Sequence, residues 1–482
     1  MLFNSLEFFI FLPTVFCLYW FIFQKNIRVQ NLLLLISSYV FYGWWDYRFL
    51  SLIFLSTIVD YFAGLKIHDS NDKKTKKSYL WISILFNLGL LGFFKYFNFF
   101  IDSWIDLLGV FGYEQKSTWT LNVILPIGIS FYTFQTMSYS LDIYYGKLKP
   151  TKDFISFASF VSFFPQLVAG PIERASNLLP QILNNRKFNY EQGVQGLRLI
   201  LWGMFKKVVI ADSLAPFVDT IFQNYTTLNG GTLLLGLIYF SFQIYCDFSG
   251  YSDIAIGTSK LFGFELMSNF KFPIFSRDIR EFWQKFHISM SSWFRDYLYM
   301  NILLRLRAYG IYGLIFATFF TYSIIGLWHG ASFTFIVYGL IHAIYFLPII
   351  IKRKQPYKTE IFSFNSLRTT AKEIFLCIKT WLYFSFSLCF FRSENVYGAI
   401  DYLVKMIINF SIPTSNRYGV FYVLIILVFD WFLRKNERNV LSFHMCFNKK
   451  VDRLLSLLFY YVLIYIIFDF YKDERNFIYF QF

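Results

Sequence analysis

The sequence has little charge and little cysteine. Charged residues make up 16% of its 482 positions, whereas 56% are hydrophobic and 23% are aromatic. A soluble domain carries about 25% charged residues, so the composition excludes an ordinary soluble protein. The five cysteines include no CxxC pair, and we therefore expect neither a disulfide framework nor a zinc or other metal site.

Polar stretches long enough to fold as a separate soluble domain are also lacking. Apolar runs of roughly 17 to 22 residues recur instead, which is the length a helix needs to cross a bilayer. The formal charge is +15, but the basic residues lie in short loops between these runs, a pattern typical of cytoplasmic loops and not of nucleic-acid binding. The sequence thus predicts an all-α polytopic membrane protein with about 11 transmembrane helices plus re-entrant or interfacial helices.

The apolar runs and the loops between them also predict a topology. Basic loops follow the first and third runs, at Lys25, Arg28 and His68–Ser78, and they place the N-terminus outside the cytoplasm. No basic segment precedes the first run, so we interpret it as a retained helix. The expected spans are Ser5–Phe23, Asn31–Trp45, Phe49–Leu65, Tyr79–Phe100, Leu233–Phe248, Ile311–Leu327, Phe333–Ile351, Ile374–Phe391, Tyr418–Leu433 and Leu454–Phe470, with a partial helix at Tyr397–Phe410.

The middle of the chain is less regular than its ends. Leu125–Gly146 and Phe163–Arg174 are apolar but are broken by proline and glycine. Irregular backbone at membrane depth needs protein or a water-filled cavity around it, so we expect broken helices that line a cavity; surface loops are the alternative. Lys206 and Lys207 lie inside the apolar run Val194–Phe217, where we expect them to snorkel towards an interface.

Three of the five histidines, His287, His329 and His342, fall in the window Asp247–His342. Ionisable residues among apolar runs are costly, which makes this window the expected place of the chemistry. His329 stands between Trp328 and a glycine that lets another group approach closely, and its imidazole could accept a proton from a hydroxyl. A structural hydrogen bond between helices is the alternative for His329, and a packing role is the better interpretation of His342.

His287 lies in a segment that is too charged to cross lipid by itself. If the segment is one helix, Trp283 and His287 share a face, as do Ser292 and Asp296. It could line a wet funnel or lie along the interface as an amphipathic helix. The remaining candidates are weaker: Asp247 and Asp253 form a carboxylate pair without a metal signature, and His68 and His444 are expected to be solvated.

Five motifs carry a family resemblance. They are LPIGISFYTFQ, FFPQLVAGPIER, CDFSGYSDIAIG, FWQKFHISMSSWFRDYLY and GLWHGA. Together they resemble the membrane-bound O-acyltransferase family, in the branch that holds the alginate O-acetylation membrane protein and the peptidoglycan O-acetyltransferase A type. The resemblance runs from MLFNSLEFFIFLP to FIYFQF, and Cys246 stands where a phenylalanine is expected.

The resemblance implies a single domain over residues 1–482, with its core motifs in 121–343 and helices that enclose a central tunnel. It implies that His329 and His287 are catalytic, with supporting roles for Asp253, Trp328, Arg295, Asp296, Trp283 and Ser289. The implied reaction takes an acetyl group from acetyl-CoA or another cytosolic thioester, with no bound cofactor. The group crosses a bacterial inner membrane to polysaccharide hydroxyls, through a periplasmic partner of the SGNH-esterase type that this chain does not contain.

Other functions remain open at this point. A related branch transfers D-alanine to teichoic acid, and a lipid or protein acyltransferase would keep the chemistry but change the acceptor. If the protein were a transporter or flippase, substrate would cross the membrane without any bond being made, and activity would survive the loss of His329. A scaffold for a secretion complex tolerates loss of both histidines.

Overall fold

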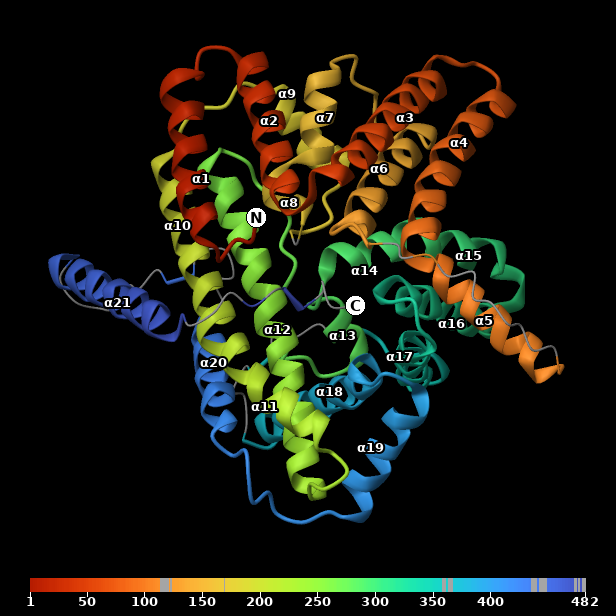
Figure 1. The fold of residues 1–482 in the computed structure, drawn as a ribbon, viewed down its shortest axis with the longest axis vertical. Coiled ribbons are helices and arrows are strands. Elements are labelled where there is room, and N and C mark those ends of the chain that lie inside the picture. Colours follow the sequence, from red (N-terminus) through yellow and green to blue (C-terminus); the bar gives the residue numbers. More distant parts are fainter. Residues whose placement is uncertain are drawn as a thin grey trace. The chain divides into compact units, whose positions relative to one another are not determined.

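The computed structural model describes most of the chain as helices in two compact units. The described residues are 1–112, 121, 124–168, 170–357, 361–362, 367–434, 440–441, 449–471, 475 and 477–478, and they contain no strand. The N-terminal unit comprises Met1–Gly193 and Thr258–Met267, and the C-terminal unit comprises Val194–Gly257 and Ser268–Phe482 (Figure 1). The expectation for His444 falls outside the described residues.

The prediction of a multi-pass helical membrane protein is confirmed. Within the described residues, seven helices are long and apolar enough to cross a membrane, and three shorter apolar helices accompany them. The long candidates are Ile27–Asp69, Lys73–Val110, Gly230–Leu261, Arg307–His329, Phe333–Ile351, Thr369–Arg392 and Val451–Phe470; the shorter ones are Leu6–Ile22, Phe154–Leu167 and Gly419–Leu433. Exposed apolar side chains such as Leu454 and Phe468 then face lipid, which is as apolar as they are.

In the N-terminal unit, helices α3 (Leu50–Asp69), α4 (Lys73–Leu91) and α6 (Ile129–Tyr144) lie side by side (Figure 1). The carboxylate of Asp60 on α3 is buried and bonded to the other two helices. Asp60 accepts hydrogen bonds from the Ser83 hydroxyl, from the Ser140 hydroxyl at 3.2 Å and from the Asn87 amide at 2.8 Å. Hydrogen bonds of this kind hold helices together in lipid, where burial of apolar surface gives little drive.

Asp60→Ala should therefore destabilise this unit. The change leaves three buried donors without their acceptor, and each orphaned donor costs about 1–3 kcal/mol. We expect the free energy of unfolding in mixed micelles to fall by about 3 kcal/mol or more. Asp102→Ala, which removes an exposed carboxylate in α5 (Phe97–Val110), is the matched control. Equal stability of the two variants would contradict a structural role for Asp60.

Both segments expected to be irregular contain irregular backbone, but only the second is an interrupted helix. In the first, an irregular stretch ends at Gly128, whose φ of +76° lies in the left-handed region, and α6 begins directly after it. In the second, α7 (Phe154–Ser162) stops at Phe163 and α8 (Phe164–Leu167) is a single turn. A Cβ atom on Gly128 would lie 2.6 Å from the carbonyl oxygen of Leu167, so the two segments touch backbone to backbone and only glycine fits.

In the C-terminal unit, α10 (Tyr190–Met204) continues into a π-helical turn, Phe205–Ala211, and then into α11 (Asp212–Gln223). This turn presents two consecutive lysines to α12 (Gly230–Leu261), where Lys206 pairs with Asp253 at 2.7 Å and Lys207 with Asp247 at 2.8 Å. The snorkelling prediction is wrong, because both ammonium groups are buried and neutralised by these carboxylates.

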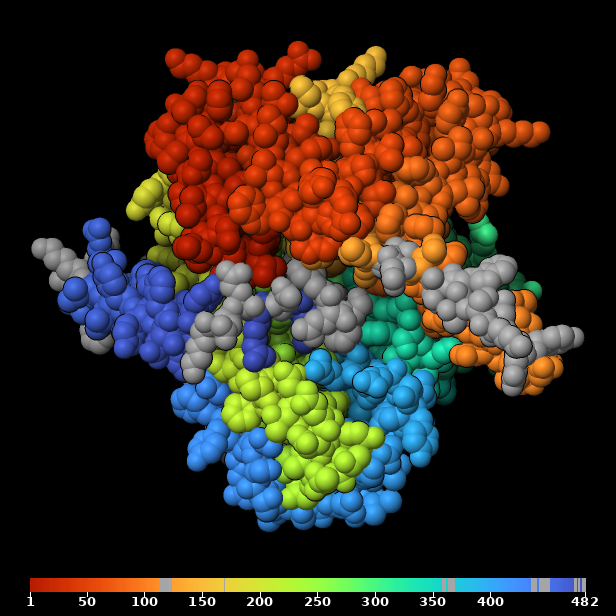
Figure 2. All heavy atoms as spheres, in the orientation of Figure 1, coloured from red at the N-terminus to blue at the C-terminus, as the bar shows by residue number. Residues whose placement is uncertain are grey.

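The rest of this unit includes six longer helices. They are α16 (Gly310–His329), α17 (Phe333–Ile351), α18 (Leu367–Arg392), α19 (Val396–Ile408), α20 (Gly419–Leu433) and α21 (Lys449–Phe470). Figure 2 shows the surface of α11, in yellow-green, beside that of α19, in blue, and Phe222 stacks on Tyr402 between them at 4.8 Å. The expected partial helix at Tyr397–Phe410 is thus an ordinary helix that packs on α11.

Candidate active site

His329 is the last residue of α16. The backbone turns to an extended conformation at Gly330, and the imidazole is only 4% exposed. Its ring lies 5.0 Å from that of Trp328 and 5.4 Å from that of Phe391 on α18. A Cβ atom on Gly330 would lie 2.1 Å from the Phe335 ring, so the glycine permits the close approach that the sequence predicts.

His287 lies at a break in the chain. Helix α13 (Ile279–Trp283) ends before it and α14 (Ile288–Phe294) begins after it, and His287 itself has a left-handed φ of +46°. The prediction that Trp283 and His287 share the face of one helix is therefore wrong. The chain leaves the helix because the Lys271 N–H donates to the Lys285 carbonyl and the Ile288 N–H to the Asn269 carbonyl. Helix α14 continues without a break into a π-helical turn, Arg295–Tyr299, so the prediction that Ser292 and Asp296 share a face stays a prediction.

Asn269 fixes the tautomer of the neutral His287 ring. The Asn269 side-chain oxygen accepts from the Ser289 N–H at 3.2 Å and from the Ser289 hydroxyl at 2.9 Å, and it lies 3.2 Å from Nδ1 of His287. A backbone N–H can only donate, so the atom facing it is the amide oxygen, and Nδ1 carries the hydrogen. The lone pair of His287 is then on Nε2. Burial lowers the pKa of His287 to about 3, which keeps the ring neutral at physiological pH.

Aromatic rings connect the three histidines. Trp328 lies 5.7 Å from the His287 ring and 5.0 Å from the His329 ring, so both imidazoles contact the same indole. Tyr338 lies 5.8 Å from His329 and 4.7 Å from His342. His342 also lies 3.0 Å from the Ser387 hydroxyl, which agrees with its interpretation as a packing histidine. His329 and His287 therefore share one apolar, buried environment in the C-terminal unit.

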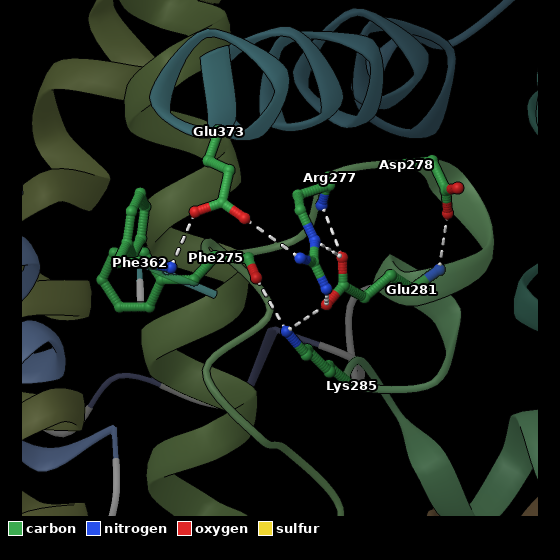
Figure 3. Close-up of polar contacts among 7 residues, drawn as sticks. All are labelled: Phe275, Arg277, Asp278, Glu281, Lys285, Phe362 and Glu373. Carbon is green, nitrogen blue, oxygen red and sulfur yellow. Dashed lines mark hydrogen bonds and ion pairs between the residues drawn. The ribbon is translucent and has the colours of Figure 1, made fainter. Parts of the chain in front are cut away.

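Three of the charged residues before His287 form one ion cluster with Glu373 (Figure 3). The buried guanidinium of Arg277 contacts Glu281 at 3.1 Å and Glu373 of α18 at 3.1 Å, and Lys285 contacts Glu281 at 3.0 Å. Burial alone would raise the pKa of Glu281, but the hydrogen bonds from Arg277 and the charge of Lys285 bring it below its usual value. The cluster fastens the chain just before His287 to α18, and both the interfacial helix and the wet funnel stay predictions for this segment.

Arg277→Met should destabilise the C-terminal unit, because it removes the cation that Glu373 contacts in this cluster and leaves Glu281 with Lys285 alone. Breaking a buried ion pair on one side costs about 3–5 kcal/mol. The free energy of unfolding in mixed micelles measures the loss. Arg295→Met removes the exposed partner of Asp296, an ion pair of 2.7 Å, and should change stability by no more than about 1 kcal/mol. Similar losses in both variants would contradict the assignment.

The other predicted residues differ in what they contact: some contact a histidine ring, and others form ion pairs. Trp328 contacts both catalytic candidates, and Ser289 shares Asn269 with His287. Trp283 packs on His342 at 5.1 Å. Asp253 forms an ion pair with Lys206, and Arg295 forms a separate ion pair with Asp296. No group of three or more metal-binding side chains occurs among the described residues.

Sequence reasoning missed Asn269 and Ser387. Asn269 lies 18 positions before His287, and Ser387 lies 45 positions after His342. Neither residue stands in a charged or periodic motif that singles it out, so the sequence contains no signal for these contacts. The turn at His287, which brings Asn269 to the ring, is set by long-range backbone hydrogen bonds.

The buried histidines lie in a multi-pass helical membrane protein, and its family is shown by comparison with known proteins. Residues 74–391 match the membrane-bound O-acyltransferase family, and the chain belongs to that family.

Three relatives show how the chain compares within it. It is 43% identical over 306 residues to a protein of Pseudomonas putida named "Probable alginate O-acetylase AlgI". The aligned residues cover 63% of this chain and 61% of that protein. The chain is 37% identical over 331 residues to the peptidoglycan O-acetyltransferase of Helicobacter pylori, with 63% and 62% covered. It is 29% identical over 190 residues to the teichoic acid D-alanyltransferase of Bacillus subtilis, with 38% and 47% covered. The match thus spans about three fifths of the first two relatives.

Proposed function

We propose that this protein is a membrane O-acetyltransferase that moves an acetyl group from a cytosolic thioester, such as acetyl-CoA, to hydroxyl groups of an extracytoplasmic polysaccharide. The observation that carries the proposal is the contact of His329 and His287 with one buried indole, that of Trp328. Two buried imidazoles in an apolar layer suit proton transfer during acyl transfer, because bulk water is kept away from the rings.

The roles of the two histidines follow from their surroundings. His329 is the general base, which takes the proton of the attacking hydroxyl and returns it to the departing thiolate, so that no net proton is consumed. His287 has a pKa of about 3, too low for an efficient base at neutral pH. With Nδ1–H held by Asn269, it orients the reacting groups through Nε2. Supporting roles remain proposed for Trp328 and Ser289, which contact these rings, and for Trp283, Asp253, Arg295 and Asp296.

The acceptor and the partner are inferred from the relatives. Identity is higher to the alginate and peptidoglycan O-acetylating relatives than to the D-alanyltransferase, which favours acetyl transfer to a polysaccharide. We propose that the chain lies in a bacterial inner membrane with its N-terminus outside. The acetyl group passes through a tunnel to a periplasmic SGNH-type partner that completes transfer to the polymer.

Acetyl transfer by the purified protein tests the proposal. The protein is placed in proteoliposomes with radiolabelled acetyl-CoA on one side, and acetyl release or transfer is followed over time. In parallel, cells that lack the gene are complemented with it, and base-labile acetyl esters on their envelope polysaccharides are measured. Acetyl esters that appear only with the gene support the proposal. Transport of the acetyl donor without bond cleavage would favour a transporter instead.

A further inference from the structure

Two residues near the C-terminus are docked beside the proposed active site. The side chains of Phe477 and Ile478 are 0% and 3% exposed. The backbone N–H of Ile478 donates to Oδ2 of Asp247 on α12 at 2.7 Å, a contact that spans 231 sequence positions. Phe477 and Ile478, called the C-terminal segment below, are therefore held inside the C-terminal unit by a buried carboxylate.

Asp247 has a second partner, so each of its two oxygens has a separate task. Its Oδ1 atom pairs with the Lys207 ammonium at 2.8 Å, and Lys207 in turn pairs with Asp212 at 2.8 Å. The side chains of Lys207 and Asp247 are 2% and 3% exposed. An amide at position 247 could not serve both partners, because its nitrogen only donates and would face either the ammonium or the Ile478 N–H.

Ring contacts lead from this segment to His287. Phe477 packs on Tyr251 at 4.7 Å and on Phe248 at 5.5 Å. Phe248 meets the His287 ring edge-on at 4.5 Å. The imidazole is thus held by Asn269 at its Nδ1 atom and by Phe248 at its ring, and Phe248 is itself backed by Phe477.

We propose that Asp247 and Phe477 are positioning residues: Asp247, neutralised by Lys207, fastens the C-terminal segment, and Phe477 holds Phe248 against the imidazole of His287. The proposal rests on the proposed function, since it assigns these residues to the orientation of a catalytic side chain. It also explains why a buried carboxylate and a buried ammonium stand side by side on α12 and the neighbouring π-helical turn. Misplacement of a reacting group by about 1 Å can cost about 100-fold in rate.

Steady-state kinetics of three variants test the positioning role. Asp247→Asn and Phe477→Ala should lower kcat about 10- to 100-fold and leave the KM for the thioester within about two-fold, because they move His287 and leave the donor site intact. Phe477→Leu retains an apolar side chain and should recover most of the rate. Asp430→Asn is the matched control, since Asp430 is also buried and bonds Tyr245 at 2.7 Å. It should leave kcat unchanged.

Thiol labelling tests the docking without any need for activity. Ile478→Cys is introduced in a chain in which Cys17 and Cys446 are serine, and its reaction with a maleimide is timed. We expect labelling at least about ten-fold faster when Asp247→Asn is added, because the segment is released and local opening exposes the thiol. Adding Asp430→Asn instead should leave the labelling rate unchanged. Size-exclusion profiles and melting temperatures show whether each variant is folded. If Asp247→Asn is unfolded, the labelling rate is compared with and without Phe477→Ala instead.

The outcomes separate the two proposals. If Asp247→Asn does not speed labelling, Asp247 does not fasten the segment and the inference is overturned. If labelling speeds up but kcat matches that of the Asp430→Asn control, the segment docks without positioning His287, which also overturns it. If the wild-type protein transfers no acetyl group with donor, acceptor and partner present, the proposed function fails, whereas the labelling rates still decide the docking.

Discussion

Replacement of His329 by alanine is expected to abolish acetyl transfer and to leave the fold intact. A positioned general base contributes about 10²- to 10⁴-fold to the rate. His329 is the last residue of α16, and no other described residue occupies that position to replace it as the base. The loss should appear in kcat and in kcat/KM alike, because the base acts in the transition state. The measurement is the rate of acetyl transfer in proteoliposomes that contain equal amounts of folded protein.

His342→Gln is the matched control for this experiment. His342 lies in the same aromatic layer and is fully buried, but its contacts are with Ser387, Trp283 and Tyr338. We expect about 1–3 kcal/mol of lost stability from the altered hydrogen bond and a rate within about three-fold of wild type. If His329→Ala and His342→Gln retain equal activity, His329 is structural and the transporter interpretation gains.

Gly339→Leu should prevent α16 and α17 from packing. A Cβ atom at Gly339 would lie 2.1 Å from the Tyr322 carbonyl oxygen, and one at Gly326 would lie 2.1 Å from the Phe335 carbonyl oxygen. The two backbones therefore touch, as helices in lipid do where small residues allow it. Even modest overpacking costs about 1–3 kcal/mol, and a leucine against backbone atoms should cost more. We expect little folded protein and no acetyl transfer.

The control for this prediction is Gly89→Leu in α4, where a Cβ atom would have no other heavy atom within 4 Å. The yield of monodisperse protein by fluorescence-detected size exclusion compares the two variants, and the Gly89 variant should match wild type. If Gly339→Leu also folds normally, the close backbone contact between α16 and α17 is not needed to place His329.

The sequence predicts the apolar parts of the helices well. The expected span Phe333–Ile351 coincides with α17, because a glycine-rich turn and a basic cluster delimit it. The expected span Leu233–Phe248 is too short, since α12 continues to Leu261 through the polar DFSGYSD motif. A prediction from hydropathy ends a helix where charged residues begin. Here the buried lysines of the π-helical turn neutralise Asp247 and Asp253, and the helix continues past them.

The candidate site is only partly visible in the sequence. His329 stands out because a histidine beside glycine interrupts two apolar runs, and the family motifs single out His287 as well. The left-handed conformation of His287 and its contact with Asn269 are not visible, because both depend on hydrogen bonds between distant segments. For the same reason the sequence does not reveal the ion pair between Arg277 and Glu373 on α18.

The indole shared by the two imidazoles has a thermodynamic consequence. Because Trp328 contacts both His287 and His329, a change at either histidine alters the surroundings of the other. Residues that are in contact show coupling energies of about 0.5–3 kcal/mol in double-mutant cycles. The kinetic penalties of removing His287 and His329 should therefore not add, and the double variant should be much less impaired than the product of the single losses. In this sense the two histidines and the tryptophan behave as one energetic unit.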